Sequence, residues 1–226
     1  MAYYPIFLNL TNKKALVVGG GQVAQRKVET LLECDASVSV VSRDLTPMLK
    51  EWADQGKIEY RGTTFEGKML DGIFIVISAT DDSQLNHKVS VFAQERGLLI
   101  NAVDQPEDCN FIVPAIIRRG DLQVAISTSG KSPALARKIR IELEQYFGEE
   151  YGKMLLLMGK ARDWVLSKGL PQEKNRQLFH KLVESDMMQA ITRGDRKRGV
   201  EILRDVFGDD ISPDRLLKRV FKREVK

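Results

Sequence analysis

The chain has 226 residues, of which 43% are apolar and 29% are charged, so it is long enough for one large or two small domains. No run approaches the roughly 18 apolar residues of a membrane span. The first ten residues contain no Lys or Arg, so no signal peptide is expected. The two cysteines, Cys34 and Cys109, lie far apart and predict free thiols in a reducing compartment. We therefore expect a cytoplasmic protein.

The charge is unevenly distributed. Residues 151–226 hold 18 Lys and Arg against 11 Asp and Glu, whereas residues 1–150 hold 17 against 20. A basic excess of this kind is typical of a solvated helix surface, because acids are mixed in throughout. It also leaves open a polyanionic partner, either nucleic acid or a small molecule.

Up to about residue 113 the pattern predicts alternating strands and helices. Apolar, β-branched runs predict strands at 15–19, 37–41, 58–62, 72–80 and 98–104. Helical spacing predicts helices at 23–33, 44–55 and 83–97. Near-continuous apolar strands separated by helices indicate a parallel sheet covered on both faces, so we expect an α/β, Rossmann-like domain.

The pattern changes after residue 110. Residues 111–128 predict two strands joined by a turn at 119–121, with Pro114 favouring an edge position. A helix follows, with Ser132 as N-cap and Pro133 in its first position. Helices are then predicted at 154–169, 173–185, 187–195, 196–208 and 212–224. We expect a dinucleotide-binding domain at 1–113, a small α+β dimerisation segment at 114–150 and a helical domain at 151–226.

A glycine turn joins the first predicted strand to its helix. Gly19, Gly21 and Ala24 fit the G-x-G-x-x-A dinucleotide fingerprint. Gly19 permits a tight turn, Gly21 lacks the Cβ that would collide with a pyrophosphate, and Ala24 lets the helix approach the sheet. The helix N-terminus then offers free N–H groups to the phosphates.

Other residues at the carboxyl ends of the strands are candidates for the same crevice. Ser42 occupies the usual place of the ribose-binding acid, with Asp44 a late candidate, and Arg43 hints at a 2′-phosphate. The sequence does not decide between NAD and NADP. Thr80 and Asp81 follow the fourth strand, although helix capping is the alternative for Asp81 and Asp82.

Asp104 ends the fifth predicted strand, where a carboxylate points into the crevice or is satisfied by nearby backbone N–H groups. The hydroxyl-rich loop "STSGKSP" either holds an anion at a helix N-terminus or is an ordinary N-cap. The histidines, His87 and His180, have no metal-ligand spacing, and no metal site is expected.

Four segments together resemble the precorrin-2 dehydrogenase family, which is the N-terminal module of siroheme synthases. They are "PIFLNL", "VVGGGQVAQRKVETLL", "SATDDSQLN" and "NAVDQPEDCNFIVPAIIRRGDLQVAISTSGKSPALARKIR", and they cover most of residues 5–145 in the family's order. The methyltransferase domain of fused siroheme synthases is not expected in this chain.

The resemblance implies an NAD-dependent dehydrogenase that converts precorrin-2 to sirohydrochlorin for sirohaem, acting as a homodimer. Some members also insert Fe²⁺. The family's key aspartate matches Asp104, and its nucleotide contacts match Gln22, Val23, Arg43 and Asp44. Thr128 stands where some relatives carry a serine that can be phosphorylated. The substrate-binding residues are expected to be Asn101, Ser127, Thr128, Ser129 and Lys131.

Chemistry and charge agree with this hypothesis. Asp104 could take a proton while the nicotinamide accepts a hydride, and basic residues suit a polycarboxylate substrate. Three alternatives remain open. They are a bifunctional dehydrogenase and ferrochelatase, a different oxidoreductase with the same nucleotide domain, and an NAD-sensing regulator with a basic, nucleic-acid-binding tail.

Overall fold

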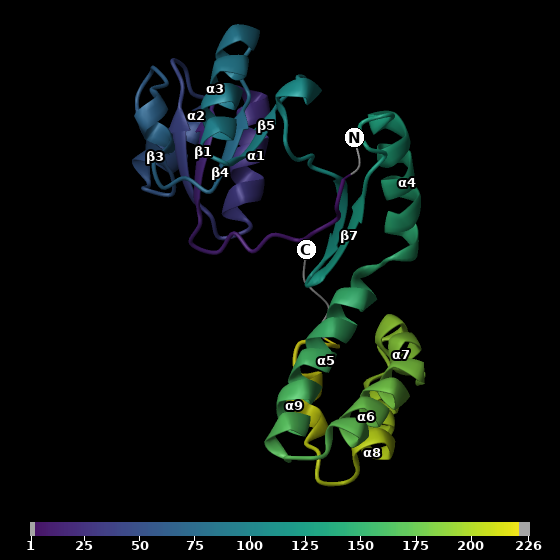
Figure 1. Cartoon of the computed structure of the whole chain (residues 1–226). Helices are drawn as coiled ribbons and strands as arrows, with labels where there is room; N and C mark the ends of the chain where they lie inside the picture. Colours follow the sequence, from purple (N-terminus) through teal and green to yellow (C-terminus); the bar gives the residue numbers. More distant parts are fainter. Residues whose placement is uncertain (1–2, 222–226) are drawn as a thin grey trace. The chain divides into compact units, whose positions relative to one another are not determined.

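A computed structural model describes residues 3–221 (Figure 1). The chain divides into two compact units. The first, called the sheet unit here, contains residues 3–113 and Ser129–Lys131. The second, called the helical unit, contains Pro114–Thr128 and the chain from Ser132 onward. None of the helices within residues 3–221 combines the length and apolar character that crossing a membrane requires.

The sheet unit is built on a five-stranded parallel sheet in the order β3-β2-β1-β4-β5. The strands are β1 (Lys14–Val18), β2 (Ser37–Val41), β3 (Glu59–Tyr60), β4 (Ile75–Ser78) and β5 (Leu99–Ala102). This is the strand order of a doubly wound nucleotide-binding fold, and it confirms the predicted Rossmann-like class. β4 is shorter than predicted because the chain turns at Gly72, which has a φ of +72°.

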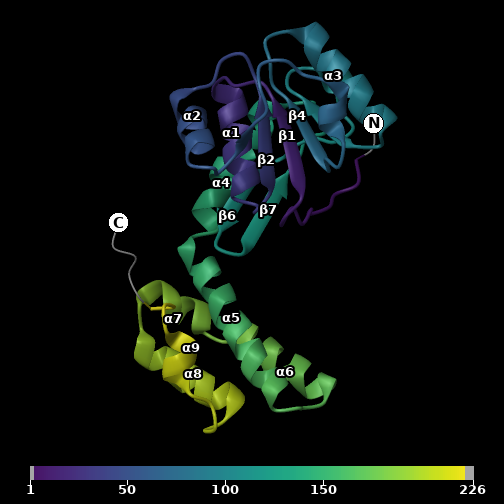
Figure 2. The ribbon, with the colours of Figure 1, turned by 90° about the vertical axis from the view of Figure 1, so that its left-hand side faces the viewer.

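Helices cover both faces of this sheet, which explains the unbroken apolar run in β1. Ala15 and Val17 pack into one core with α1 (Gln22–Leu32) and α2 (Pro47–Asp54). Leu16 and Val18 pack into a second core with α3 (Ser83–Glu95) and the 3₁₀ turn η1 (Gly67–Leu70). Figure 2 shows α1 and α2 on one side of the strands and α3 on the other. A second 3₁₀ turn, η2 (Pro106–Asp108), follows β5.

The helical unit begins with the predicted hairpin. β6 (Ala115–Arg119) and β7 (Leu122–Ile126) are antiparallel and turn at Gly120, whose φ is +56°. α4 (Pro133–Tyr146) packs against this hairpin. Its N-cap is Ser132, as predicted, because the Ser132 hydroxyl accepts a hydrogen bond from the N–H of Leu135 at 3.2 Å.

The remaining helices share one apolar core. They are α5 (Glu149–Ser167), α6 (Gln172–Glu184), α7 (Met187–Arg193), α8 (Arg196–Phe207) and α9 (Pro213–Leu217). α5 begins five residues earlier than predicted, because Glu149 and Glu150 favour a helix N-terminus. α9 is shorter than predicted, because Arg219 adopts a left-handed conformation with a φ of +72°. The end of the predicted helix, 222–224, lies outside the described residues.

Candidate functional site

The carboxyl ends of parallel strands lie along one edge of the sheet. The strands β2, β1, β4 and β5 are consecutive in this sheet, and their pairing places Val41, Val18, Ser78 and Ala102 in register at the same edge. The strand ends and the residues that follow them, 19–21, 42–44, 80–82 and 101–105, therefore meet at one edge of the sheet unit.

The three consecutive glycines of the turn after β1 have different surroundings. A Cβ on Gly19 would lie 2.2 Å from the carbonyl oxygen of Ala79, and a Cβ on Gly20 would lie 2.0 Å from that of Asp44. These two glycines are therefore required by contacts within the chain, and Gly19 also has a φ of +122°. A Cβ on Gly21 would meet nothing within 4 Å. The requirement for Gly20 was not predicted from the sequence.

The open position is the one that fits a diphosphate. Gly21 is the N-cap residue of α1, and no side chain caps this helix. The first N–H groups of α1, which include those of Gln22 and Val23, are free of a side-chain acceptor and carry the positive end of the helix dipole. Space, free donors and positive potential coincide there, so the turn fits a dinucleotide phosphate.

The segment after β2 is braced by its own hydrogen bonds. The hydroxyl of Ser42 donates to the carbonyl of Asp44 at 2.7 Å, and the hydroxyl of Tyr60 donates to the carbonyl of Ser42 at 2.9 Å. The N–H of Thr46 donates to the carbonyl of Gly20 at 2.9 Å, which ties this segment to the glycine turn. The side chains of Arg43 and Asp44 are exposed.

The segment after β4 is organised by Asn86, a buried residue of α3 that the sequence analysis did not single out. Its Oδ1 accepts hydrogen bonds from the hydroxyls of Ser78 and Thr80, each at 2.7 Å. Its Nδ2 donates to the carbonyl of Thr80 at 3.0 Å. The predicted capping role falls to Asp82, whose carboxylate accepts from two N–H groups at the start of α3. Asp81 is exposed.

Asp104 lies in the turn after β5 with a φ of +60°, a left-handed conformation that aspartate tolerates better than most residues. Its side chain is exposed and makes no hydrogen bond or ion pair with any residue of the described range 3–221. The alternative in which backbone N–H groups satisfy this carboxylate is thus not observed. Asn101 is engaged, because its Nδ2 donates to the carbonyl of Phe111 at 3.2 Å.

Cys109 fastens the same turn to the end of β5. Its Sγ accepts from the N–H of Ala102 at 3.1 Å and lies 3.2 Å from the carbonyl oxygen of that residue. Burial raises the pKa of Cys109, so the thiol stays protonated and can keep donating. Burial also lowers the pKa of Lys27 on α1, an effect to which Arg26 adds and which the nearby Cys109 opposes.

The hydroxyl-rich loop forms the N-terminus of α4. The hydroxyl of Thr128 accepts from the N–H of Ser132 at 3.2 Å and lies 3.0 Å from the Ser132 carbonyl oxygen. Ser129 and Gly130 have φ values of +52° and +78°, which turn the chain sharply. Ser129–Lys131 belongs to the sheet unit, whereas Ser127 and Thr128 belong to the helical unit. Lys131 is exposed.

The basic helices are partly neutralised by their own acids. Arg196 pairs with Asp214, and Arg198 lies 3.3 Å from both Asp186 and Glu201. These ion pairs favour a solvated helix surface over a nucleic-acid interface for this segment. Within residues 3–221 no group of three or more His, Cys, Asp or Glu side chains could hold a metal ion.

Two family models match the chain. Residues 6–115 match a family described as "Putative NAD(P)-binding", and residues 119–146 match the "Sirohaem biosynthesis protein central" family. The first match covers nearly the whole sheet unit, and it supports NAD as the cofactor.

Similar proteins point in the same direction. The chain is 37% identical over 195 residues to the siroheme synthase of Chromobacterium violaceum, which covers 86% of this chain and 42% of that protein. It is 44% identical over 165 residues to siroheme synthase 1 of Serratia proteamaculans, covering 73% and 35% respectively. The chain thus spans less than half the length of these curated relatives.

A solved structure extends the similarity to nearly the whole fold. The structure of SirC, a precorrin-2 dehydrogenase, is similar with a TM-score of 0.77 and 25% sequence identity, over 90% of this chain and 98% of that one. The family models, the relatives and the solved structure therefore agree, and the chain belongs to the family of precorrin-2 dehydrogenases and the corresponding modules of siroheme synthases.

Proposed function

We propose that the protein catalyses the NAD-dependent dehydrogenation of precorrin-2 to sirohydrochlorin in sirohaem biosynthesis. The observation that carries this proposal is Asp104, an exposed carboxylate without a partner among residues 3–221, at the sheet edge that also holds the glycine turn. Family membership indicates the substrate class. The carboxyl edge of the sheet provides a binding place for the cofactor, and Asp104 at the same edge provides a base.

The residues divide the work as follows. Gly21, Gln22 and Val23 hold the diphosphate with backbone N–H groups, while Arg43 and Asp44 contact the adenosine ribose. Ser42, Thr80 and Asp81 complete the cofactor site. When bound, the nicotinamide is the acceptor for the hydride that precorrin-2 loses. Asp104 takes the accompanying proton, because its carboxylate is exposed and has no partner among residues 3–221.

A macrocycle with several carboxylates needs positive charge and hydrogen-bond donors. We propose that Lys131 pairs with a substrate carboxylate, and that Asn101, Ser127, Thr128 and Ser129 contribute polar contacts. We also propose three segments with separate tasks: 1–113 binds NAD, 114–150 forms a dimer contact and 151–226 forms the helical domain. The two free thiols, Cys34 and Cys109, suit a cytoplasmic setting.

The test is anaerobic incubation with precorrin-2 and NAD or NADP, following the reduced cofactor. Asp104→Asn should lower kcat by about 10²-fold or more, because a positioned base contributes about 10²–10⁴-fold, while NAD affinity stays unchanged. The matched control is Asp71→Asn, an exposed aspartate that precedes β4 at the opposite edge of the sheet. Wild-type turnover by Asp104→Asn with normal NAD binding would remove the proposal.

Iron insertion is a second candidate, and the same carboxylate favours it. Placing Fe²⁺ in sirohydrochlorin releases two pyrrole protons, and an unpaired base such as Asp104 can accept a proton. Sirohydrochlorin and Fe²⁺ supplied without NAD should then give the sirohaem spectrum at a rate that Asp104→Asn lowers. Absence of any enzyme-dependent spectral change would leave dehydrogenation alone.

We also propose that the chain is a homodimer through α4 and the β6–β7 hairpin. Leu135, Ile141 and Tyr146 of α4 are 49%, 44% and 68% exposed, and the described part of the chain provides this two-stranded hairpin with no further strand. Ile141→Glu should therefore give a monomer in sedimentation or light scattering. Val183→Glu, at a 58% exposed valine of α6, is the matched control and should stay dimeric. An unchanged dimer with Ile141→Glu would contradict this interface.

A further inference from the structure

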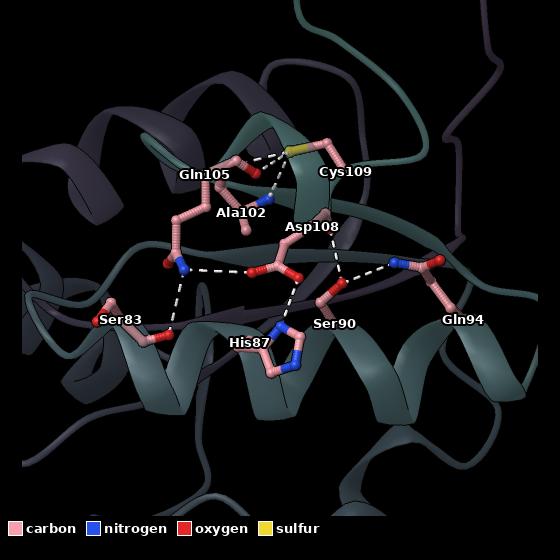
Figure 3. A network of polar contacts seen from close by, with 8 residues as sticks. All are labelled: Ser83, His87, Ser90, Gln94, Ala102, Gln105, Asp108 and Cys109. Carbon is pink, nitrogen blue, oxygen red and sulfur yellow. Dashed lines mark hydrogen bonds and ion pairs between the residues drawn. The ribbon is translucent and has the colours of Figure 1, made fainter.

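A polar stripe on α3 faces the turn that carries Asp104. Ser83, His87, Ser90 and Gln94 follow one another at helical spacing, so their side chains project from the same side of the helix. Each of the four contributes to a hydrogen-bonded cluster with the segment after β5, and Figure 3 shows this cluster from close by. The proposed function makes no use of it.

The centre of the cluster is Asp108, the last residue of η2, which is 5% exposed. Its Oδ1 lies 2.7 Å from Nδ1 of His87, and its Oδ2 accepts from Nε2 of Gln105 at 3.2 Å. Its backbone carbonyl accepts from the hydroxyl of Ser90 at 2.7 Å. A buried carboxylate requires such partners, because an unpaired charge away from water is costly.

Of the side chains that contact Asp108, those of His87, Ser90 and Gln105, only His87 is ionisable. A carboxylate only accepts hydrogen bonds, so Nδ1 of His87 carries the proton that it donates to Asp108. The neutral imidazole in this tautomer and the imidazolium both donate from Nδ1, so the contact survives a change in the charge of His87. The imidazole side chain is 65% exposed, so packing in the core is not the reason for a histidine at position 87.

The cluster encloses Asp104 in sequence. Ala102, two residues before it, is held by Cys109, and Gln105, directly after it, donates to the carbonyl of Ser83 at 3.2 Å. Asp108 then joins this segment to α3 through His87. Asp104 itself has a left-handed backbone, which the surrounding structure must impose. We infer that His87 is a positioning residue, which fixes η2 against α3 through Asp108 and thereby holds the Asp104 carboxylate in its working place.

The inference rests on the proposed function, in which Asp104 is the base, so its test needs two kinds of measurement. The first is hydrogen exchange of the full chain without substrate, at the amides of Gln105, Asp108 and Cys109, which donate to carbonyls within this turn or at the end of β5. The second is steady-state turnover of precorrin-2 with NAD, analysed separately for kcat and KM.

The variants are His87→Ala, His87→Asn and the control His180→Ala. Alanine favours a helix, so His87→Ala removes the donor without weakening α3. Asparagine places an amide nitrogen near the position of Nδ1 and should restore the contact. His180, the other histidine of the chain, is exposed on α6 in the helical unit. His87 is the single histidine left in the His180→Ala variant. Its ring-nitrogen NMR signals can therefore be assigned without ambiguity, and they show whether Nδ1 is protonated.

For His87→Ala we expect amide exchange in the turn to accelerate about tenfold or more. We expect kcat to fall about tenfold with KM within about twofold, because a misplaced base affects the chemical step. His87→Asn should recover most of both effects, and His180→Ala should match the wild type.

Unchanged exchange in His87→Ala would overturn the inference whatever the turnover. Faster exchange with wild-type kcat, in an enzyme that Asp104→Asn inactivates, would overturn the positioning role alone. If Asp104→Asn also keeps wild-type kcat, the proposed function has failed and the catalytic role of His87 fails with it. Faster exchange would then be the effect of a purely structural contact.

Discussion

At the scale of single residues, the three glycines of the turn after β1 are needed for two different reasons. The sequence alone does not distinguish a glycine that the fold requires from a glycine that a ligand requires. Gly19 and Gly20 are needed because backbone carbonyls of the same chain come within 2.2 Å and 2.0 Å of where a Cβ would lie. Gly21 has open space around it and a φ of −79°, which any residue can adopt. Folding thus constrains the first two positions, and in our proposal the bound diphosphate constrains the third.

This division gives a paired prediction. Gly19→Ala should lower the free energy of unfolding by about 2 kcal/mol or more, because it combines a collision with a backbone conformation that alanine resists. Gly21→Ala should cost less than about 1 kcal/mol, the size of an N-cap change, but should weaken NAD binding strongly. Urea denaturation and NAD titration of both variants check this, and equal stability losses would contradict it.

Cys109 gives a prediction about pH. Its pKa is raised in the folded chain by burial, so the fold favours the protonated thiol. The unfolded thiol ionises first as the pH rises, and the stabilisation is fully present below the ordinary thiol pKa of about 8.5. It should be lost as the pH rises through the folded pKa.

The comparison of Cys34→Ala with Cys34→Ala/Cys109→Ala isolates this effect. The free energy of unfolding of the single variant should fall more steeply above about pH 8.5 than that of the double variant. Parallel curves across the alkaline range would show that Cys109 does not contribute.

At the scale of elements, the caps set where helices begin. Asp82 accepts from the N–H groups of Gln84 and Leu85, each at 3.0 Å, and so starts α3, which carries both Asn86 and His87. The side chain of the adjacent Asp81 is exposed and makes no hydrogen bond or ion pair with another described residue. The two aspartates therefore differ in what they do for the fold.

Asp82→Ala should lower the free energy of unfolding by about 1 kcal/mol, the usual cost of losing an N-cap. Asp81→Ala should change it by less than about 0.5 kcal/mol, as exposed substitutions generally do. Chemical denaturation of the two variants side by side provides the measurement. An equal loss in both would mean that general charge, and not capping, stabilises this helix.

Much of this element order could be predicted from sequence, because it depends on local signals. β2 spans the predicted residues, the β6–β7 turn falls where expected, and Ser132 with Pro133 starts α4. The limits of β4 and α9 could not be predicted, because they depend on Gly72 and Arg219 adopting left-handed backbones.

The candidate site was predictable only in part, for a similar reason. Gly19, Gly21 and Asp104 carry recognisable signals, since a fingerprint and a strand end place them. Asn86 and Asp108 carry none, because their roles arise from contacts between segments 6 to 21 residues apart in sequence. No periodicity distinguishes a buried Asn that accepts from two hydroxyls from an ordinary polar helix residue.

At the scale of the whole molecule, the chain has separate cores. The sheet unit has one core on each face of its sheet, and the helices from α5 to α9 share another. Each unit buries its own apolar side chains, so each can unfold as a cooperative body.

Calorimetry should therefore show two transitions, of which NAD raises only the one belonging to the sheet unit. Leu157→Ala removes a fully buried side chain of α5 and should lower the other transition, by the equivalent of about 2–5 kcal/mol. Val17→Ala, at a fully buried position of β1, is the matched change in the sheet unit. A single transition that both variants shift equally would show that the units unfold together.

The ammonium of Lys160 on α5 donates to the backbone carbonyls of Leu216 and Lys218, where α9 ends. Peptide oxygens are present whatever side chains occupy those two positions. Substitution of residue 218 should consequently leave this anchor intact, whereas acetylation or loss of the single amine at residue 160 would remove it from the end of α9. The anchor therefore depends on which side chain stands at residue 160, and does not depend on the side chains at residues 216 and 218.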